Sequence, residues 1–412
     1  MKTVGIIAEY NPFHNGHAYQ IAKARELTGA EYVVIVMSGN FVQRGQPAVM
    51  EKSIRAEAAL LCGADVVLEL PVHYSTASAE YFASGAVTLL HRLGVVDALC
   101  FGSECGEIGR LSKLADALLT EDEAFKSLLK KRLKEGIPYP QARNDVLCTV
   151  FPQLSEELPL LKYPNNILGL EYLKALKKLN SQIRPYTMPR MGSGYHDESL
   201  DSPYSSALAI RESLAAGKSL YSIKEQLPTA VHELMVRHYE KSFPILPDDF
   251  SLLLAYKLLQ EQDRDFGVYF DIDSDFSDRL RKFLPAYMNY ASFCETLKTK
   301  NVTYTKVSRS LLHILLNIEQ ADMNAFCSQD YVYYARILGF RKESVPLLAA
   351  MKAHTDIPLL SKLADANDLI TSENGRRMLE QDIKTSHIYA LAVQHKFHQN
   401  FQNEYQKQLV IL

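Results

Sequence analysis

The sequence predicts an α/β fold, with a doubly wound parallel sheet in the N-terminal half followed by an all-helical C-terminal domain. In the first hundred residues, apolar runs alternate with helical segments, which is typical of a parallel sheet covered on both faces. After about residue 216, strand signals fade and amphipathic helices dominate. The 412 residues exceed what one hydrophobic core usually serves. We therefore expect two domains, residues 1–216 and 217–412.

Apolar runs and the turn residues between them place the individual elements. Strands are expected at residues 3–9, 32–37, 65–70, 97–101 and 182–188. Helices are expected at residues 15–27, 50–62 and 76–93, over most of 106–181 with an interruption at Pro138 and Pro140, and from Ser206 onward. The early strands are separated by helices, as the crossover connections of a parallel sheet require.

Composition and charge exclude several classes of protein. Hydrophobic residues make up 47% of the chain and charged residues 23%, which indicates a soluble globular protein and excludes long disorder. No apolar run approaches the roughly 18 residues that indicate a membrane span. The N-terminus MKTVGIIAEYNPF turns polar too early for a signal peptide, so we expect a cytoplasmic protein. The formal net charge of -3 gives no global attraction to nucleic acid but leaves room for a local basic face.

The cysteines are expected to be free thiols. They are Cys62, Cys100, Cys105, Cys148, Cys294 and Cys327. None forms a CxxC pair, which disfavours a zinc ribbon. Most lie beside apolar residues, so we interpret them as buried thiols of a protein in a reducing compartment.

The segment EYNPFHNGH, residues 9–17, carries the strongest indication of chemistry. It leaves the first predicted strand and enters the first predicted helix, where a Rossmann-like sheet holds nucleotide phosphates. Gly16 permits a close backbone approach, and the N–H groups at the helix start favour a phosphate. His14 and His17 can point at one site and donate hydrogen bonds to phosphate oxygens. At the α-phosphate of ATP, such donors stabilise the charge that develops during in-line attack.

Two other interpretations of these histidines are open. One is a metal pair, but the HExxH helix of zinc hydrolases has a glutamate between its histidines. Here Asn15 and Gly16 take the two intervening places. The other interpretation is that His14 and His17 merely cap the turn.

The residues HNGH resemble the signature of the HxGH nucleotidyltransferase superfamily, which includes the class I aminoacyl-tRNA synthetases. Longer strings resemble one family in particular, the bacterial tRNA(Met) cytidine acetate ligases. These strings are GIIAEYNPFHNGH (5–17), MSGNFVQRGQPA (37–48), LELP (68–71), FGSE (101–104), YPNNILGLEY (163–172) and YHD (195–197). The resemblance covers the N-terminal domain by motifs and extends into the C-terminal half by order and length.

This resemblance implies both a fold of the HxGH nucleotidyltransferase type and a reaction. The family activates acetate with ATP, forming acetyl-adenylate and pyrophosphate, and then acetylates the wobble cytidine of elongator tRNA(Met). For this chain it implies ATP, acetate and tRNA as substrates, with neither a membrane nor a protein partner indicated. We also expect Mg²⁺ to offset the charge of the triphosphate, although no carboxylate cage is visible in the sequence.

The resemblance also implies the residues of the site. His14 and His17 are the expected catalytic residues. The expected ATP contacts form one continuous segment and four separate positions: Ile7, Ala8, Glu9, Tyr10, Asn11, Pro12, Phe13, His14, Asn15, Gly16, His17, Ala18, Tyr19, Gln20, Gly102, Asn165, Arg190 and Ser206.

Some of these positions have structural alternatives. Asn165 and Asn166 begin a predicted helix, where asparagine is a good N-cap, and Ser206 can be an N-cap as well. His196 and Asp197 form a polar pair that suits either acid–base work or a structural hydrogen bond within a loop.

The segment YSSALAIRESL (204–214) resembles the superfamily motif ISSTxIR, in which a helix start and an arginine hold the ATP phosphates. Arg211 matches that arginine. Ala207 and Leu208 replace a serine and a threonine, which removes two hydroxyl groups and weakens the case for phosphate binding by this motif.

Polar residues after the second strand face the same crevice. Asn40, Gln43 and Arg44 are expected to bind phosphate or RNA there, or else to form a solvated loop. Lys52 opens the next helix as either a phosphate contact or a surface lysine, and Glu69 closes the third strand in a structural role.

The C-terminal half is the expected tRNA-binding part. Interleaved tyrosines and basic residues suit neutralisation of the RNA backbone and stacking of bases, although such runs are often only a solvated face. The expected tRNA contacts are Arg44, Arg281, Lys282, Lys298, Lys300, Tyr304, Lys306 and Arg309. Two other functions stay open: a nucleotidyltransferase acting on a small phosphorylated metabolite, and a non-catalytic RNA-binding protein.

Overall fold

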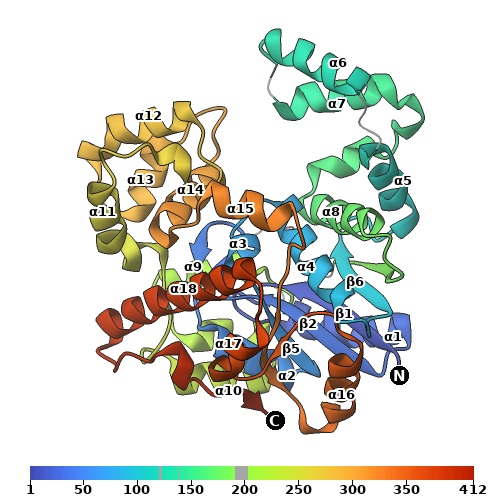
Figure 1. The fold of residues 1–412 in the computed structure, drawn as a ribbon, viewed down its shortest axis with the longest axis vertical. Helices are drawn as coiled ribbons and strands as arrows, with labels where there is room; N and C mark the ends of the chain where they lie inside the picture. Colours follow the sequence, from blue (N-terminus) through green and yellow to red (C-terminus); the bar gives the residue numbers. More distant parts are fainter. Residues whose placement is uncertain (120–122, 138, 191–202) are drawn as a thin grey trace.

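The computed structural model describes residues 1–119, 123–137, 139–190 and 203–412. A mainly parallel sheet lies at the centre with helices packed around it (Figure 1). Its strands run in the order β10-β8-β5-β2-β1-β6-β7, and β9 pairs with β8. The five strands from β5 to β7 are parallel to one another, which confirms the predicted α/β fold.

The five parallel strands lie within two residues of their predicted bounds. They are β1 (Thr3–Ala8), β2 (Tyr32–Ser38), β5 (Val66–Leu70), β6 (Ala98–Ser103) and β7 (Arg184–Pro189). A short antiparallel hairpin, β3 (Phe41–Val42) and β4 (Gln46–Pro47), stands where a polar loop was expected. The continuous apolar runs give buried strands because helices cover both faces of the sheet.

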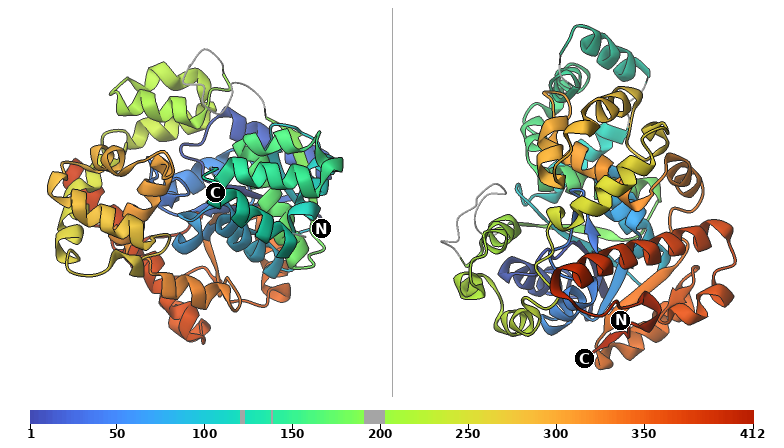
Figure 2. Two further views of the ribbon diagram at one scale, coloured as in Figure 1. Left: turned by 90° about the horizontal axis from the view of Figure 1, so that it is seen from above. Right: turned by 90° about the vertical axis from the view of Figure 1, so that its left-hand side faces the viewer.

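Nine helices connect or flank these strands in the described part of the N-terminal half. They are α1 (Asn15–Thr28), α2 (Lys52–Leu61), α3 (Val72–Ser75), α4 (Ala79–Arg92), α5 (Ile108–Leu119), α6 (Glu123–Lys134), α7 (Tyr139–Val150), α8 (Pro164–Lys178) and α9 (Ala207–Ala215). The pair α6 and α7 projects away from the sheet (Figures 1 and 2).

The C-terminal half is mainly helical. Its helices are α10 (Thr229–His238), α11 (Ser251–Gln260), α12 (Ser274–Phe283), α13 (Tyr290–Leu297), α14 (Tyr304–Leu316), α15 (Gln320–Cys327), α16 (Val345–His354), α17 (Ala366–Leu369) and α18 (Glu373–Phe397). Helices α11 to α14 gather beside the sheet as one group (Figures 1 and 2).

The all-helical expectation for this half needs one correction, because three strands come from it. These are β8 (Ala335–Phe340), β9 (Leu359–Leu360) and β10 (Val410–Ile411), and β8 pairs antiparallel with β5. The charged Arg336 interrupts the apolar run of β8, which hides the strand from periodicity. The C-terminal half therefore extends the same sheet, and a domain boundary near residue 216 stays a prediction.

A buried ionic cluster ties the two halves together. Lys52 Nζ lies 2.7 Å from Glu69 Oε1 and 2.5 Å from Glu404 Oε1. Arg336 lies 3.1 Å from Glu69 and 2.8 Å from Glu404. All four side chains are at most 9% exposed. Lys52 is thus neither a phosphate contact nor a surface lysine, whereas the structural role expected for Glu69 is confirmed.

The cysteines are free, as expected. Only Cys100 and Cys294 are buried, however, and Cys148 is exposed, so the expectation of buried thiols holds for a minority. No helix in the described ranges combines the length and the apolar character needed to cross a membrane.

Candidate active site

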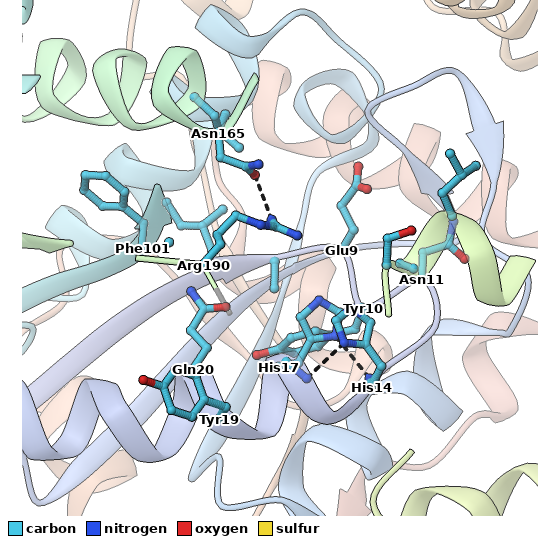
Figure 3. A pocket seen from close by; sticks show the side chains of 18 of the residues that line it. Glu9, Tyr10, Asn11, His14, His17, Tyr19, Gln20, Phe101, Asn165 and Arg190 are labelled. Atoms are coloured by element: carbon cyan, nitrogen blue, oxygen red, sulfur yellow. Dashed lines mark hydrogen bonds between the residues drawn. The ribbon is translucent and has the colours of Figure 1, made fainter. Parts of the chain in front are cut away.

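A cavity of about 240 Å³ lies at the carboxyl end of the parallel sheet. Its walls come from the ends of β1, β6 and β7, the starts of α1, α8 and α9, and the turn between β3 and β4 (Figure 3). Ligands of open α/β sheets bind at this edge. The position agrees with the one predicted for the HxGH segment.

Most of the expected ATP contacts line this cavity. They are Ile7, Ala8, Glu9, Tyr10, Asn11, His14, Gly16, His17, Tyr19, Gln20, Gly102, Asn165, Arg190 and Ser206. The lining does not include Pro12, Phe13, Asn15 or Ala18. Asn15 instead donates its amide to the carbonyl oxygens of Pro203 and Glu225, at 3.0 and 2.8 Å, and Phe13 is buried in the core.

The two histidines cap the first helix. Nδ1 of His14 accepts the N–H of Gly16 at 3.0 Å, and Nδ1 of His17 accepts the N–H of His14 at 3.2 Å. The rings lie 3.8 Å apart between centroids. Both histidines therefore do cap the turn, but the caps use only one nitrogen of each ring.

The caps determine which nitrogen carries the proton. A neutral imidazole has one donor and one acceptor nitrogen, and Nδ1 is the acceptor in both rings. The remaining nitrogen, Nε2, is therefore the donor. Since both rings line the cavity (Figure 3), capping and phosphate binding are compatible uses of the same residues.

Both rings are neutral at pH 7. Burial, followed by the nearby charges of Arg190 and Arg211, lowers the pKa of His14 to about 3. Burial, His14 and Arg190 lower the pKa of His17 well below its usual value. The pair therefore offers hydrogen-bond donors without a positive charge of its own.

Gly16 is required by the fold of this turn. A Cβ at this position would lie 2.8 Å from Cε1 of His14, so a larger residue would displace the imidazole. The glycine in the motif thus makes room for the imidazole that caps the helix. It also permits a close approach to the backbone at this position.

Arg190 is held by a relay of polar side chains. Its Nη1 donates to Oδ1 of Asn165 at 3.0 Å, and Nδ2 of Asn165 donates to Glu104 at 2.7 Å. Glu104 also accepts the N–H groups of Asn165 and Asn166, at 3.2 and 2.8 Å. A carboxylate at a helix start is favourable. The cap of α8 is therefore Glu104, and neither asparagine is the N-cap that was expected as an alternative.

Glu104 was not predicted as part of the site. Glu104 belongs to the FGSE string and directly follows a buried strand. That position is the only feature of the sequence that could have indicated a residue of the site. Gly102 in the same string faces Arg190, because a Cβ at Gly102 would lie 3.3 Å from Cγ of Arg190.

Three arginines make the cavity suitable for an anion. Arg44, Arg190 and Arg211 all line it, and burial lowers the pKa of each guanidinium. Arg211 donates to the carbonyl oxygen of Asn11 at 2.8 Å. Partly desolvated cations gain interaction energy when an anion enters.

Ser206 is the N-cap of α9, accepting the N–H of Ala209 at 3.1 Å, and it also lines the cavity.

The predicted tRNA contacts of the C-terminal half differ in their exposure. Lys306 pairs with Asp271, and Arg309 pairs with the same carboxylate at 3.1 Å, so both are engaged within the fold. Lys282 and Lys300 are exposed, whereas exposed Lys298 pairs with Glu295 at 2.8 Å. Arg281 pairs with Asp278 at 3.4 Å, and Tyr304 is half-buried.

Two further expectations have different outcomes. Asn40 is buried and accepts the N–H of Lys52 at 2.8 Å, which makes it a structural residue. Gln43 and Arg44 line the cavity, as expected. His196 and Asp197, within the YHD string, lie outside the described residues.

A parallel sheet with a histidine-capped helix start and arginines at its carboxyl edge defines a nucleotide-binding protein of the nucleotidyltransferase class. A family model described as HIGH Nucleotidyl Transferase matches residues 1–404. The chain is 36% identical to the tRNA(Met) cytidine acetate ligase of Acetivibrio thermocellus, over 100% of both chains. It is 38% identical to that of Caldanaerobacter subterraneus subsp. tengcongensis, over 95% of this chain and 96% of the relative.

Solved structures give the same result. The apo structure of Thermotoga maritima TmcAL superposes with a TM-score of 0.93 at 30% identity, over 100% of both chains. The structure of that protein bound with alpha-thio ATP gives a TM-score of 0.91 at the same identity and coverage. The chain therefore belongs to the tRNA(Met) cytidine acetate ligase family of HIGH nucleotidyltransferases, which confirms the resemblance found in its sequence.

Proposed function

We propose that this protein activates acetate with ATP and acetylates the wobble cytidine of elongator tRNA(Met). The observation that carries the proposal is the similarity, over the full length of both chains, to a relative named tRNA(Met) cytidine acetate ligase. The cavity alone would also suit other nucleotidyltransferases. Because the substrate is tRNA, we place the reaction in the cytoplasm.

In the first step, an acetate oxygen attacks the α-phosphorus of ATP and pyrophosphate leaves. The Nε2–H groups of His14 and His17 donate to the α-phosphate oxygens as charge develops on them. Arg190, fixed by Asn165, lies beside the same phosphate, and Arg44 and Arg211 neutralise the leaving pyrophosphate. The caps and the relay hold these donors in place before the nucleotide arrives, which reduces the reorganisation needed during the reaction.

Mg²⁺ fits this site as a companion of the nucleotide. The described residues include no cluster of three or more ligating groups that could hold a metal by themselves. Mg²⁺ commonly takes most of its ligands from substrate phosphates and water. When bound, it supplies further neutralisation of the triphosphate.

The helical half packs against the turn that carries Arg44, which supports its proposed role in binding tRNA. The carbonyl oxygen of Gly45 accepts hydrogen bonds from Tyr290 and Ser308, at 3.0 and 2.8 Å. Gly45 has a φ of 73°, and a Cβ there would lie 2.3 Å from the backbone nitrogen of Arg309. The turn that brings Arg44 to the cavity is therefore pressed against α13 and α14.

The division of labour between residues 1–216 and 217–412 is part of this proposal. Removing the second half would also remove β8, which pairs with β5, and Glu404, which pairs with Lys52. Tests of tRNA binding should therefore keep the whole chain and change single surface residues.

The exposed lysines give a prediction for tRNA binding. Replacing Lys300 with alanine should weaken binding modestly and reduce the slope of log affinity against log salt by ~0.7–0.9, one phosphate contact. Lys306→Ala is the comparison, because it breaks a pair with Asp271. This variant should be less stable than the wild type, and its salt slope should stay close to that of the wild type. Filter binding across a salt series measures both. If Lys282, Lys298 and Lys300 all left the slope unchanged, tRNA would have to lie elsewhere, for example along residues 130–134 of α6.

The overall reaction is tested by transfer of labelled acetate to tRNA. Elongator tRNA(Met) with a wobble cytidine should become labelled when ATP is present, and digestion should yield N4-acetylcytidine. A transcript with uridine at the same position is the matched control and should stay unlabelled. Equal labelling of both transcripts, or none of either, would contradict the proposed function.

A further inference from the structure

We propose that Glu9 accepts the proton from the cytidine amine during acetyl transfer and recognises that amine beforehand. The inference rests on the proposed function and concerns its second step. The resemblance had placed Glu9 among the ATP contacts. The geometry and charge of its surroundings suit a different role.

Glu9 is rigidly held at the cavity wall. It follows β1 directly and lines the cavity (Figure 3). Its Oε1 accepts the N–H of Gln43 at 2.7 Å, and its carbonyl oxygen accepts Nη1 of Arg55 at 2.6 Å. Arg55 is fully buried and also donates to the carbonyl oxygens of Met50 and Ser38, at 2.9 and 3.1 Å. Both the backbone and one carboxylate oxygen of Glu9 are therefore fixed.

The charge of Glu9 does not suit a triphosphate. Among the described residues that line the cavity, Glu9 is the only one with a carboxylate side chain, while Arg44, Arg190 and Arg211 supply the cations. A carboxylate repels phosphate oxygens, whereas it accepts hydrogen bonds from the N4 amine of cytosine. This group is therefore placed for the nucleophile of the second step.

Glu9 also lies on the side of the cavity from which we expect the tRNA. Its partner Gln43 belongs to the turn between β3 and β4. Gly45 of that turn contacts α13 and α14 through Tyr290 and Ser308. A cytidine that enters between this turn and the nucleotide would meet the Glu9 carboxylate and the acyl group together.

The chemistry requires such an acceptor. N4 of the cytidine attacks the carbonyl carbon of acetyl-adenylate, and a C–N bond forms. The bond between that carbon and the phosphate oxygen then breaks, and its electron pair leaves with AMP. The proton lost by N4 passes to the Glu9 carboxylate, which later releases it to water. A positioned base of this kind typically contributes about 10²–10⁴ to the rate.

The test separates the two steps in the full-length protein. Glu9→Gln keeps the shape and can still accept the N–H of Gln43, so the fold should persist, as circular dichroism would verify. With enzyme loaded with labelled acetyl-adenylate, transfer to elongator tRNA(Met) in a single turnover should slow by about 10²-fold or more. The loss of transfer should be much larger than any loss of acetate-dependent ATP–pyrophosphate exchange.

The pH profile distinguishes a base from a residue that only positions its neighbours. The dependence of transfer on pH in the wild type should differ from that in Glu9→Gln, which has no ionisable group at this position. Glu9→Asp, which keeps the carboxylate, should recover part of the rate and the wild-type form of the profile. A loss of exchange in Glu9→Gln as large as the loss of transfer would overturn the proposal by assigning Glu9 to ATP or Mg²⁺, and normal transfer would overturn it as well. Absence of acetate-dependent exchange in the wild type would instead contradict the proposed function.

Discussion

Replacing His17 with alanine is expected to lower acetate-dependent ATP–pyrophosphate exchange by about 10²–10³-fold, the usual cost of losing one donor to a developing oxyanion. The ring is neutral and lines the cavity, and its Nδ1 is occupied by the cap. Its Nε2–H is therefore the group that the reaction uses. Exchange of labelled pyrophosphate into ATP measures the loss.

The cap must be separated from the catalytic role, because His17→Ala also removes an acceptor for the N–H of His14. Loss of a cap typically costs about 0.5–2 kcal/mol of stability. His17→Gln is the matched control, since glutamine at this position can restore the capping hydrogen bond. We expect His17→Gln to recover stability while exchange stays low. Full recovery of exchange by glutamine would show that His17 is only a cap.

Replacing Lys52 with methionine is expected to lower the free energy of unfolding by about 3–5 kcal/mol, because it leaves buried carboxylates without part of their compensation. Although burial opposes it, Lys52 and Arg336 together hold the pKa of Glu404 at about 2. That depressed pKa contributes stability above about pH 4.5, which is lost as the pH falls towards 2. Urea unfolding followed by circular dichroism measures the change.

A surface pair provides the control for Lys52. Lys298 and Glu295 lie 2.8 Å apart with side chains 47% and 57% exposed, so Lys298→Ala should change stability by about 0–1 kcal/mol. Lys52 does not line the cavity, and KM for ATP should stay unchanged in Lys52→Met at a temperature where the variant is folded. A loss of stability as small as that of Lys298→Ala would contradict the structural role of the cluster.

Local patterns in the sequence predicted the parallel sheet and the histidine turn. The strand β1 is one uninterrupted apolar run, and His14, Gly16 and His17 are adjacent in the chain, so their geometry is determined by a single turn. The cavity position followed from the rule for parallel sheets. The strands and the histidine turn could therefore be predicted because each depends on residues that are close together in the chain.

The features that were missed depend on residues far apart in the chain. Glu104 caps a helix that begins about 60 residues later, and its role follows only from pairing between β6 and its neighbours. Lys52 pairs with Glu404, which lies near the other end of the chain. Arg336 can lie in a buried strand because the carboxylates of Glu69 and Glu404 compensate its charge. The pattern of apolar residues in the sequence does not indicate these ion pairs.

Acetate-dependent ATP–pyrophosphate exchange in the absence of tRNA tests the central claim most directly. If the cavity forms acetyl-adenylate, labelled pyrophosphate should enter ATP only when acetate is present, and the wild-type rate should fall strongly in His17→Ala. Exchange without acetate would indicate transfer of the nucleotide to some other acceptor. No exchange under any condition, from protein that binds ATP, would contradict an adenylate-forming site.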